Sequence, residues 1–187
     1  MKKNLIACVM LSGLMGGCGI TNEPEVQLQQ SYKELAPISL NVTSIDVISA
    51  NKSKTGLERH NQLLFAEVEK WARERFLPAG QHGTAVVKIS DLSIVESPLS
   101  GGKGNLFASR KDQYMGTLAI RVSINDAVGF EKSYVENQVK RSVIVPSSSS
   151  LLERENKVKL LIMEMIHDLD AQLSINIKEH LGYNLAF

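Results

Sequence analysis

Few residues in this sequence have the type and spacing that metal binding or acid–base catalysis requires. The histidines lie far apart, at His60, His82, His167 and His180, and no pair has a ligand spacing such as His-x-x-x-His. Zinc sites use such spacings because several side chains must reach one ion. Asp168 and Asp170 lie close to His167, but they alternate outward on a predicted helix, which is typical of a solvated helix edge. The sequence predicts neither a metal nor a cofactor.

Three carboxylates and a serine run are the remaining candidates for catalysis. Asp46, Asp91 and Glu96 lie on predicted strands or at their ends. Paired carboxylates can act as general acid and base, but charged residues at strand edges commonly prevent edge-to-edge aggregation. The serines at 147–150 have no Gly-x-Ser-x-Gly frame around them, so they lack the nucleophile turn of hydrolases. We therefore expect the protein not to be an enzyme.

A glycine-rich segment, SPLSGGKGNLFASRKD, lies between two predicted strands. A phosphate-binding loop needs its glycines between a strand and a helix, with Lys and then Ser or Thr behind them, and this segment has neither feature. It instead carries Leu106 and Phe107, flanked by the cations Lys103 and Arg110. Apolar tips among cations suit a groove on a partner or an anionic membrane surface. The alternative is that Leu106 and Phe107 fold back and cap the end of the domain.

Cys18 follows two glycines at the end of an apolar run, in the stretch LSGLMGGCGI. Lys2 and Lys3 precede that run, which is too short to span a bilayer, and this layout is typical of a secretory signal peptide. The stretch resembles the lipid-attachment signal of bacterial lipoproteins. The resemblance implies that residues 1–17 are a signal peptide and that Cys18 is acylated. It also implies sorting to the outer membrane, because no aspartate follows the cysteine.

Composition limits the remaining function classes. Removal of residues 1–17 leaves about 170 residues, enough for one compact domain with a hydrophobic core. The chain has 21 basic and 20 acidic residues, and loss of Lys2 and Lys3 with the signal leaves a slight excess of acid. Nucleic-acid binding needs a basic surface that this balance does not provide. With Cys8 removed and Cys18 acylated, no thiol is left to form a disulfide.

The segment 18–37 is polar and shows little periodicity, which predicts a tether. A single domain is expected over residues 38–187. Alternating apolar residues predict a first strand at 38–49, with a bulge near Thr43 and Ser44. A helix follows at 57–77, where Arg75 falls in the apolar register beside Phe76. Further strands are predicted at 83–96, with a bulge near Ser90, and at 112–126 and 130–145.

The last helix is predicted over residues 151–180, capped by Ser150 and Glu153. The order β-α-β-β-β-α predicts an α+β two-layer sandwich, in which a mainly antiparallel four-stranded sheet carries both helices on one face. Ile120 of the sheet is then expected to face Leu169 of the last helix.

This architecture is similar to that of small envelope lipoproteins of Gram-negative bacteria. These include the auxiliary lipoproteins of ABC-type transport, the YajG-like lipoproteins and, more loosely, the lipoprotein partner in lipopolysaccharide assembly. The stretches KWARERF, QYMGTLAIRVSI and SLLERENKV also resemble an uncharacterised proteobacterial lipoprotein family with no assigned activity. The resemblance covers the architecture and the lipid-attachment signal, and it implies no catalytic residue.

The resemblance implies a lipid-anchored, periplasm-facing protein of the outer membrane. Its expected role is that of a non-catalytic binding or accessory subunit in envelope lipid transport. The membrane, through the N-terminal lipid, and another envelope protein are the expected partners, and a lipid is the candidate ligand. The alternative is a structural or assembly scaffold of an outer-membrane protein complex.

Overall fold

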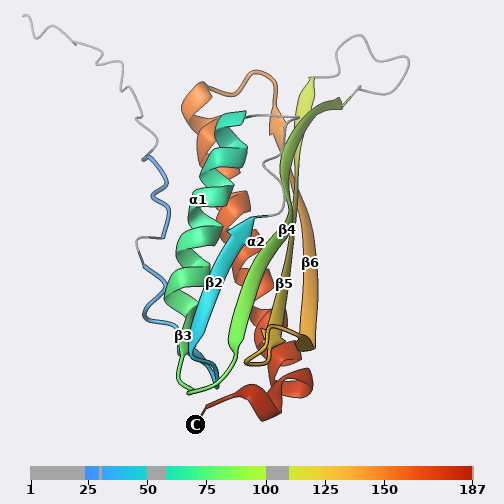
Figure 1. Cartoon of the computed structure of the whole chain (residues 1–187). Helices are drawn as coiled ribbons and strands as arrows, with labels where there is room; N and C mark the ends of the chain where they lie inside the picture. The colour runs from blue at the N-terminus through green and yellow to red at the C-terminus, as the bar shows by residue number, and fades with distance from the viewer. Residues whose placement is uncertain (1–23, 30, 50–57, 100–109, 187) are drawn as a thin grey trace, which may run out of the picture.

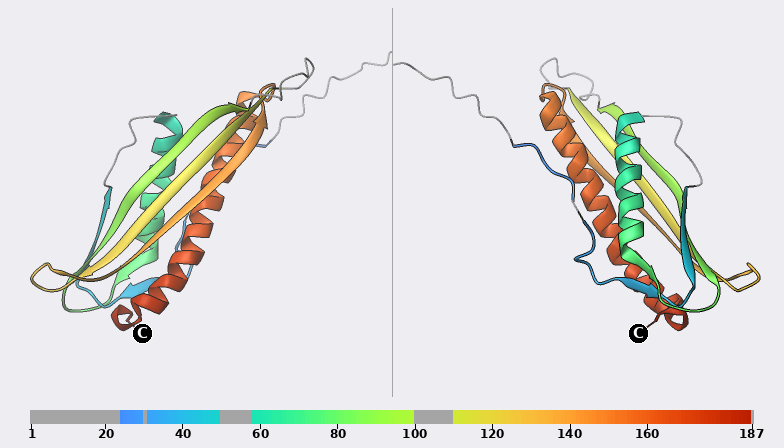
Figure 2. Two further views of the ribbon diagram at one scale, coloured as in Figure 1. Left: turned by 90° about the vertical axis from the view of Figure 1, so that its right-hand side faces the viewer. Right: turned by 60° about the vertical axis from the view of Figure 1, so that its left-hand side comes forward.

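The computed structural model describes residues 24–29, 31–49, 58–99 and 110–186. In chain order its elements are β1 (Ile38–Leu40), β2 (Ser44–Ser49), α1 (Glu58–Arg75), β3 (Phe76–Pro78), β4 (Thr84–Leu99), β5 (Lys111–Asn125), β6 (Glu131–Pro146), α2 (Leu151–His180) and the 3-10 helix η1 (Gly182–Asn184). The main sheet forms one layer, and both long helices cover the same face of it (Figure 1 and Figure 2). The α+β sandwich predicted from the sequence is confirmed.

The main sheet has the strand order β2-β4-β5-β6. β2 runs parallel to β4, whereas β4 with β5 and β5 with β6 are antiparallel pairs. The register of β4 against β5 shifts between Ile89 and Asp91. This confirms the bulge predicted near Ser90. It also explains the sequence pattern, because an extra residue moves the apolar side chains of β4 into the opposite phase.

The first predicted strand is two strands that belong to different sheets. β1 pairs in parallel with β3 in a separate two-stranded sheet, and β2 joins the main sheet. Between them the Val42 N–H donates to the Leu40 carbonyl at 2.8 Å, and both side chains are buried. The interruption lies next to the predicted bulge at Thr43 and Ser44, but its cause is a tight turn that redirects the chain from one sheet to the other.

The last predicted turn of the first helix is a strand. α1 ends at Arg75, and residues 76–78 form β3. Pro78 disfavours helical backbone at the residue before it. Phe76 and Leu77 instead adopt extended backbone and pair with β1, and the Phe76 side chain remains in the core.

Both helices turn one apolar face toward the sheet. At the start of α2 the Ser150 Oγ accepts a hydrogen bond from the Glu153 N–H at 3.1 Å, as the predicted cap requires. Ile120 and Leu169 are both fully buried in one continuous core. Within the described ranges, no helix has the combination of length and apolar character needed to cross a bilayer.

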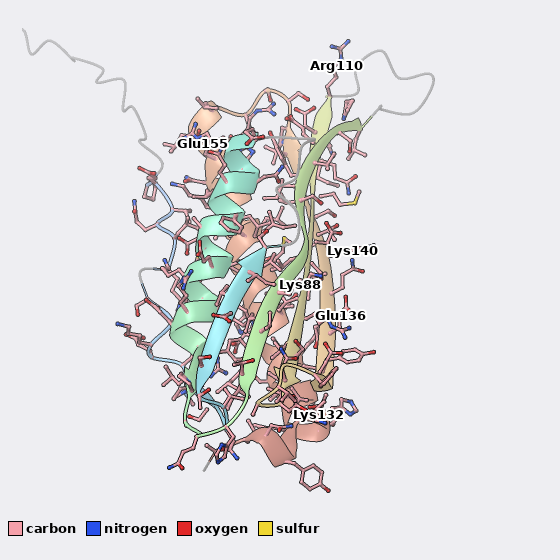
Figure 3. The ribbon with its side chains drawn as sticks, viewed as in Figure 1. Lys88, Arg110, Lys132, Glu136, Lys140 and Glu155 are labelled. Atoms are coloured by element: carbon pink, nitrogen blue, oxygen red, sulfur yellow. The ribbon has the colours of Figure 1, made fainter. Side chains whose placement is uncertain are left out.

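The other face of the sheet is not covered by a helix and is largely polar. Lys88 on β4 and Glu136 and Lys140 on β6 project from it (Figure 3). Arg121 on β5 lies over the Tyr134 ring, 3.5 Å from its centre, and pairs with Glu131 at 2.7 Å. Because one face of β6 is exposed and the other faces the helices, polar and apolar residues alternate along this strand. Its inward residues Val135, Val139 and Val145 are buried.

Candidate functional site

The N-terminal part of the described chain packs against the helical layer (Figure 2). Asn156 of α2 holds its first residues: the Asn156 Nδ2 donates to the Pro24 carbonyl at 3.1 Å, and the Val26 N–H donates to the Asn156 Oδ1 at 2.9 Å. Lys159 forms an ion pair with Glu25. From residue 24 onward the chain is therefore bound to the domain, in contrast to the free tether expected for 18–37. Composition did not indicate this because the segment has no regular apolar period.

Tyr32 fixes the middle of this N-terminal segment on α1. Its side chain is buried, its N–H donates to the Glu74 carboxylate, and its hydroxyl donates to Glu67 at 3.4 Å. The Lys70 ammonium lies 5.5 Å from the centre of the Tyr32 ring. Burial, and then the Glu67 carboxylate, raise the pKa of Tyr32 well above its usual value. The hydroxyl thus stays protonated, which suits a structural role and not that of a nucleophile.

Two hollows open between the N-terminal segment and the helices. The basic hollow has a volume of about 240 Å³, and its walls include Arg75, Ser174, Lys178, Ile38, Ile177 and Leu185. The aromatic hollow has a volume of about 140 Å³, and its walls include Tyr32, Trp71, Met163, Ile166, His167 and Asp170. The basic hollow combines cations with aliphatic side chains, as expected of a site for an amphipathic anion.

A buried polar network joins the walls of the two hollows. The Arg75 Nε donates to the Asp170 Oδ1 at 2.6 Å, and the Arg75 Nη2 donates to the Asp170 Oδ2 at 3.2 Å and to the Ser174 Oγ at 3.1 Å. The Trp71 Nε1 donates to the same carboxylate at 3.0 Å. The Arg75 side chain is only 8% exposed. Its Nη1 is buried and has no acceptor among the described residues, so one charged donor of a residue that lines the basic hollow is unsatisfied.

The charges and hydrogen bonds of this arrangement suit the binding of an anion. Arg75 and Lys178 supply two positive charges against the single negative charge of Asp170, and none of these side chains is an activated nucleophile. Within the described ranges, no group of three or more His, Cys, Asp or Glu side chains could hold a metal ion. The cations and aliphatic side chains of the basic hollow match an acidic head group with an apolar body.

The structure separates most residues that the sequence singled out. Lys103, Leu106, Phe107 and Cys18 lie outside the described residues, so the partner-binding loop and the lipidation site remain predictions. Arg110 is described and exposed, at the end of the domain where β5 begins.

The carboxylates considered for catalysis have separate environments. Glu96 accepts from the Tyr114 hydroxyl at 3.1 Å and lies 3.5 Å from Arg154, whereas Asp46 lies on β2 and Asp91 at the bulge of β4. The described part of the chain does not bring the three together in one cluster.

The aspartates of α2 are paired and do not form a free solvated edge. Asp168 accepts from the Arg141 guanidinium of β6, which lowers the pKa of Asp168, and Asp170 is largely buried against Arg75. His167 is 85% exposed. The outward, solvated position predicted for the two aspartates is therefore incorrect for Asp170.

Sequence reasoning did not identify Arg75, Ser174 and Lys178 as neighbours in a site. One signal was present: Arg75 falls in the apolar register of its helix, and a cation there must find a buried partner. Which acid it meets is a property of the packing of α1 against α2, so the sequence pattern alone could not name Asp170.

No protein-family model matches the chain, and no curated protein matches it. Solved structures resemble it with low TM-scores and low sequence identity. A minor lipoprotein from Acinetobacter baumannii has a TM-score of 0.39 and 13% identity over 79% of this chain and 98% of that chain. The rare lipoprotein B from Shewanella oneidensis has a TM-score of 0.39 and 14% identity over 73% and 99%. A putative neuraminyllactose-binding hemagglutinin homolog from Helicobacter pylori has a TM-score of 0.42 and 8% identity over 85% and 96%.

Two of these three proteins are bacterial lipoproteins by name. The TM-scores and identities are too low for a property of any of them to be transferred to this chain.

Proposed function

We propose that this chain is a lipid-anchored, periplasm-facing lipoprotein of the outer membrane that acts as a non-catalytic binding subunit in envelope lipid transport. The anchor is supported by the N-terminal sequence, in which Cys18 follows two glycines and an apolar run headed by lysines. Acyl chains on that cysteine would hold the domain to the bilayer without a membrane-spanning helix.

The observation that carries the binding role is the unsatisfied, buried Nη1 of Arg75, a residue that lines the basic hollow. A buried guanidinium donor without an acceptor is costly, and a phosphate or carboxylate oxygen is its preferred partner. Lys178 and Ser174 line the same hollow and can contact the same head group. Ile38, Ile177 and Leu185 offer an apolar wall to the first carbons of an acyl or glycerol body.

Binding of a fluorescent phosphatidylglycerol to the full-length protein tests this role, with a fluorescent diacylglycerol as the neutral probe. Lys178→Gln removes an exposed cation of the basic hollow without changing the buried network. Lys157→Gln removes a lysine from the other end of the same helix and serves as the matched control.

We expect Lys178→Gln to weaken binding of the anionic probe several-fold and Lys157→Gln to leave it unchanged, with the neutral probe bound weakly throughout. Equal binding of the anionic probe by both variants would contradict the assigned site. Copurification of a membrane protein without lipid, together with no binding of either probe, would favour the scaffold role instead.

A further inference from the structure

Two leucines at the start of α2 are exposed. Leu151 is 72% exposed and Leu152 is 37% exposed, directly after the cap at Ser150. The cap fixes the first turn of the helix, so these side chains are held outward. Neighbouring large apolar side chains on a soluble surface commonly mark a contact with a membrane or another protein.

Two cations lie beside these leucines. Arg110 and Lys111 are exposed at the start of β5, where the Ser147 N–H donates to the Arg110 carbonyl at 2.8 Å. This bond places both cations next to the turn that leads into α2, and Figure 3 shows Arg110 at this end of the molecule. In the part of the chain that the structure describes, neither side chain forms an ion pair. We call Arg110, Lys111, Leu151 and Leu152 the anchor-side surface.

Arg154 holds the parts of this surface in place. It donates to Asp112 of β5 at 2.8 Å, to the Ser147 carbonyl at 2.8 Å and to the Tyr114 hydroxyl at 3.4 Å. The guanidinium lowers the pKa of Asp112, so the pair stays charged at neutral pH. The start of β5, the turn after β6 and the first turns of α2 therefore form one connected unit.

The N-terminal segment identifies what this surface faces. Pro24 and Val26 are bound to Asn156, in the second turn of α2 and close to Leu151. Six residue steps separate Pro24 from Cys18, and an extended chain of that length spans at most about 20 Å. α2 has 30 residues and so is about 45 Å long. A lipid on Cys18 can therefore reach the anchor-side surface but cannot reach the opposite end.

The opposite end provides an internal comparison. The turn between β5 and β6 carries Val128, which is 79% exposed, and it lies near the C-terminal end of α2. The Asn184 amide of η1 donates to the Ser133 hydroxyl of β6 at 3.2 Å and confirms that proximity. Exposed apolar side chains thus occur at both ends, and the attachment of residues 24–26 distinguishes them.

The geometry points to the anchor-side surface as a docking surface for the anionic lipid bilayer that holds the acyl chains of Cys18. The two leucines enter the head-group region, while Arg110 and Lys111 contact lipid phosphates. In this orientation the anchor-side surface contacts the membrane, and the turn that carries Val128 lies farthest from the membrane. This inference rests on the proposed lipid anchor at Cys18.

Site-specific fluorescence on the full-length acylated protein tests the docking. Leu151→Cys and Val128→Cys, each labelled with an environment-sensitive dye, are reconstituted in vesicles of phosphatidylcholine with phosphatidylglycerol and a brominated lipid quencher. Acylation blocks Cys18 and the signal carries Cys8 away, so only the introduced thiol reacts. We expect strong quenching at position 151 and little at position 128. Equal quenching at the two positions in acylated protein would overturn the docking alone.

The mass of the purified protein separates this outcome from failure of the anchor. A mass without acyl chains would overturn both the lipid anchor and the docking.

A charge test adds a second readout: Arg110→Glu with Lys111→Glu should reduce quenching at position 151 several-fold in the anionic vesicles, whereas Lys132→Glu at the opposite end should not. Quenching that is unaffected by the double substitution, or that is equal in vesicles of phosphatidylcholine alone, would overturn the anionic specificity.

Discussion

Arg75 of α1 donates to both carboxylate oxygens of Asp170 of α2, at 2.6 and 3.2 Å, inside the helical layer. This two-point contact links helices that are far apart in sequence. Because Trp71 donates to the same carboxylate, the acid satisfies three donors from one helix face. The pair also holds Arg75 in the position from which it lines the basic hollow.

Asp170→Ala should destabilise the domain strongly. It leaves the Arg75 charge buried without a partner, and breaking a buried pair on one side costs about 3–5 kcal/mol. Glu69→Ala, which breaks an exposed pair with Arg73 on α1, is the matched control and should cost less than about 1 kcal/mol. Urea unfolding of both variants measures the difference, and similar losses in the two would contradict the role assigned to Asp170.

Gly80→Ala should destabilise the junction between the two sheets. A Cβ at position 80 would overlap the backbone carbon of Asn41 and lie 2.5 Å from the Val42 nitrogen. Backbone cannot move aside as a flexible side chain can, so we expect a loss of about 1–3 kcal/mol, as for overpacked cores. Gly182→Ala has no heavy atom within 4 Å of the added Cβ and should melt close to the parent. An unchanged melting temperature for Gly80→Ala would show that the contact relaxes.

His60 should make the stability depend on pH in a defined window. Burial, followed by the Arg59 charge, lowers the pKa of His60 below its ordinary value of 6.5. The unfolded chain therefore takes up the proton first as the pH falls, and the free energy of unfolding decreases below about pH 6.5. The contribution of His60 is complete above that pH and is lost as the pH falls toward the lower pKa of the folded state.

His60→Phe tests this dependence because the imidazole Nδ1 has no partner in the described chain and the ring packs edge-on against Tyr114. Unfolding free energies measured at pH 7.5 and 5.5 should fall less in the variant than in the parent. The carboxylates with lowered pKa values, such as Asp112 and Asp126, titrate below this window and do not interfere. A parent and a variant with the same pH dependence would refute the assignment.

Cys18→Ser should abolish lipid attachment, because acyl transfer to this residue needs the sulfur nucleophile. We expect the variant to incorporate no labelled palmitate and to leave the membrane fraction under washing conditions that retain the parent. Continued incorporation and equally firm retention would exclude the proposed anchor. Ser12→Ala, in the apolar run before the glycines, is a control that should leave both properties unchanged.

The elements with long, regular patterns were predictable from the sequence. β5 and β6 alternate over many residues, and α2 carries an apolar stripe behind a recognisable cap, so local rules and tertiary packing favour the same structure. The bulge of β4 was also visible, because an inserted residue reverses the phase of an alternating strand pattern. Ile120 and Leu169 could be assigned to the core because each lies on the apolar side of its own regular pattern.

The short elements and the site were not predictable in this way. β1 and β3 have three residues each, too few to show a period, and each exists only because the other lies beside it. Residues 24–29 and 31–37 show no regular apolar period, and polar side chains of both long helices hold them. The basic hollow depends on both features, since Ile38 of β1 and the N-terminal segment close it against Lys178.

The small sheet also joins β1 to the last described residues of the chain. Leu40 pairs with Leu185, the Asn41 N–H donates to the Asn184 carbonyl at 2.7 Å, and the Ala186 N–H donates to the Ser39 carbonyl at 2.9 Å. Contacts between residues this far apart form late, because the whole intervening chain must be present first. The domain therefore cannot close at this end until residues 184–186 are in place. Loss of residues 184–186 would leave the Asn41 N–H and the Ser39 carbonyl without these partners.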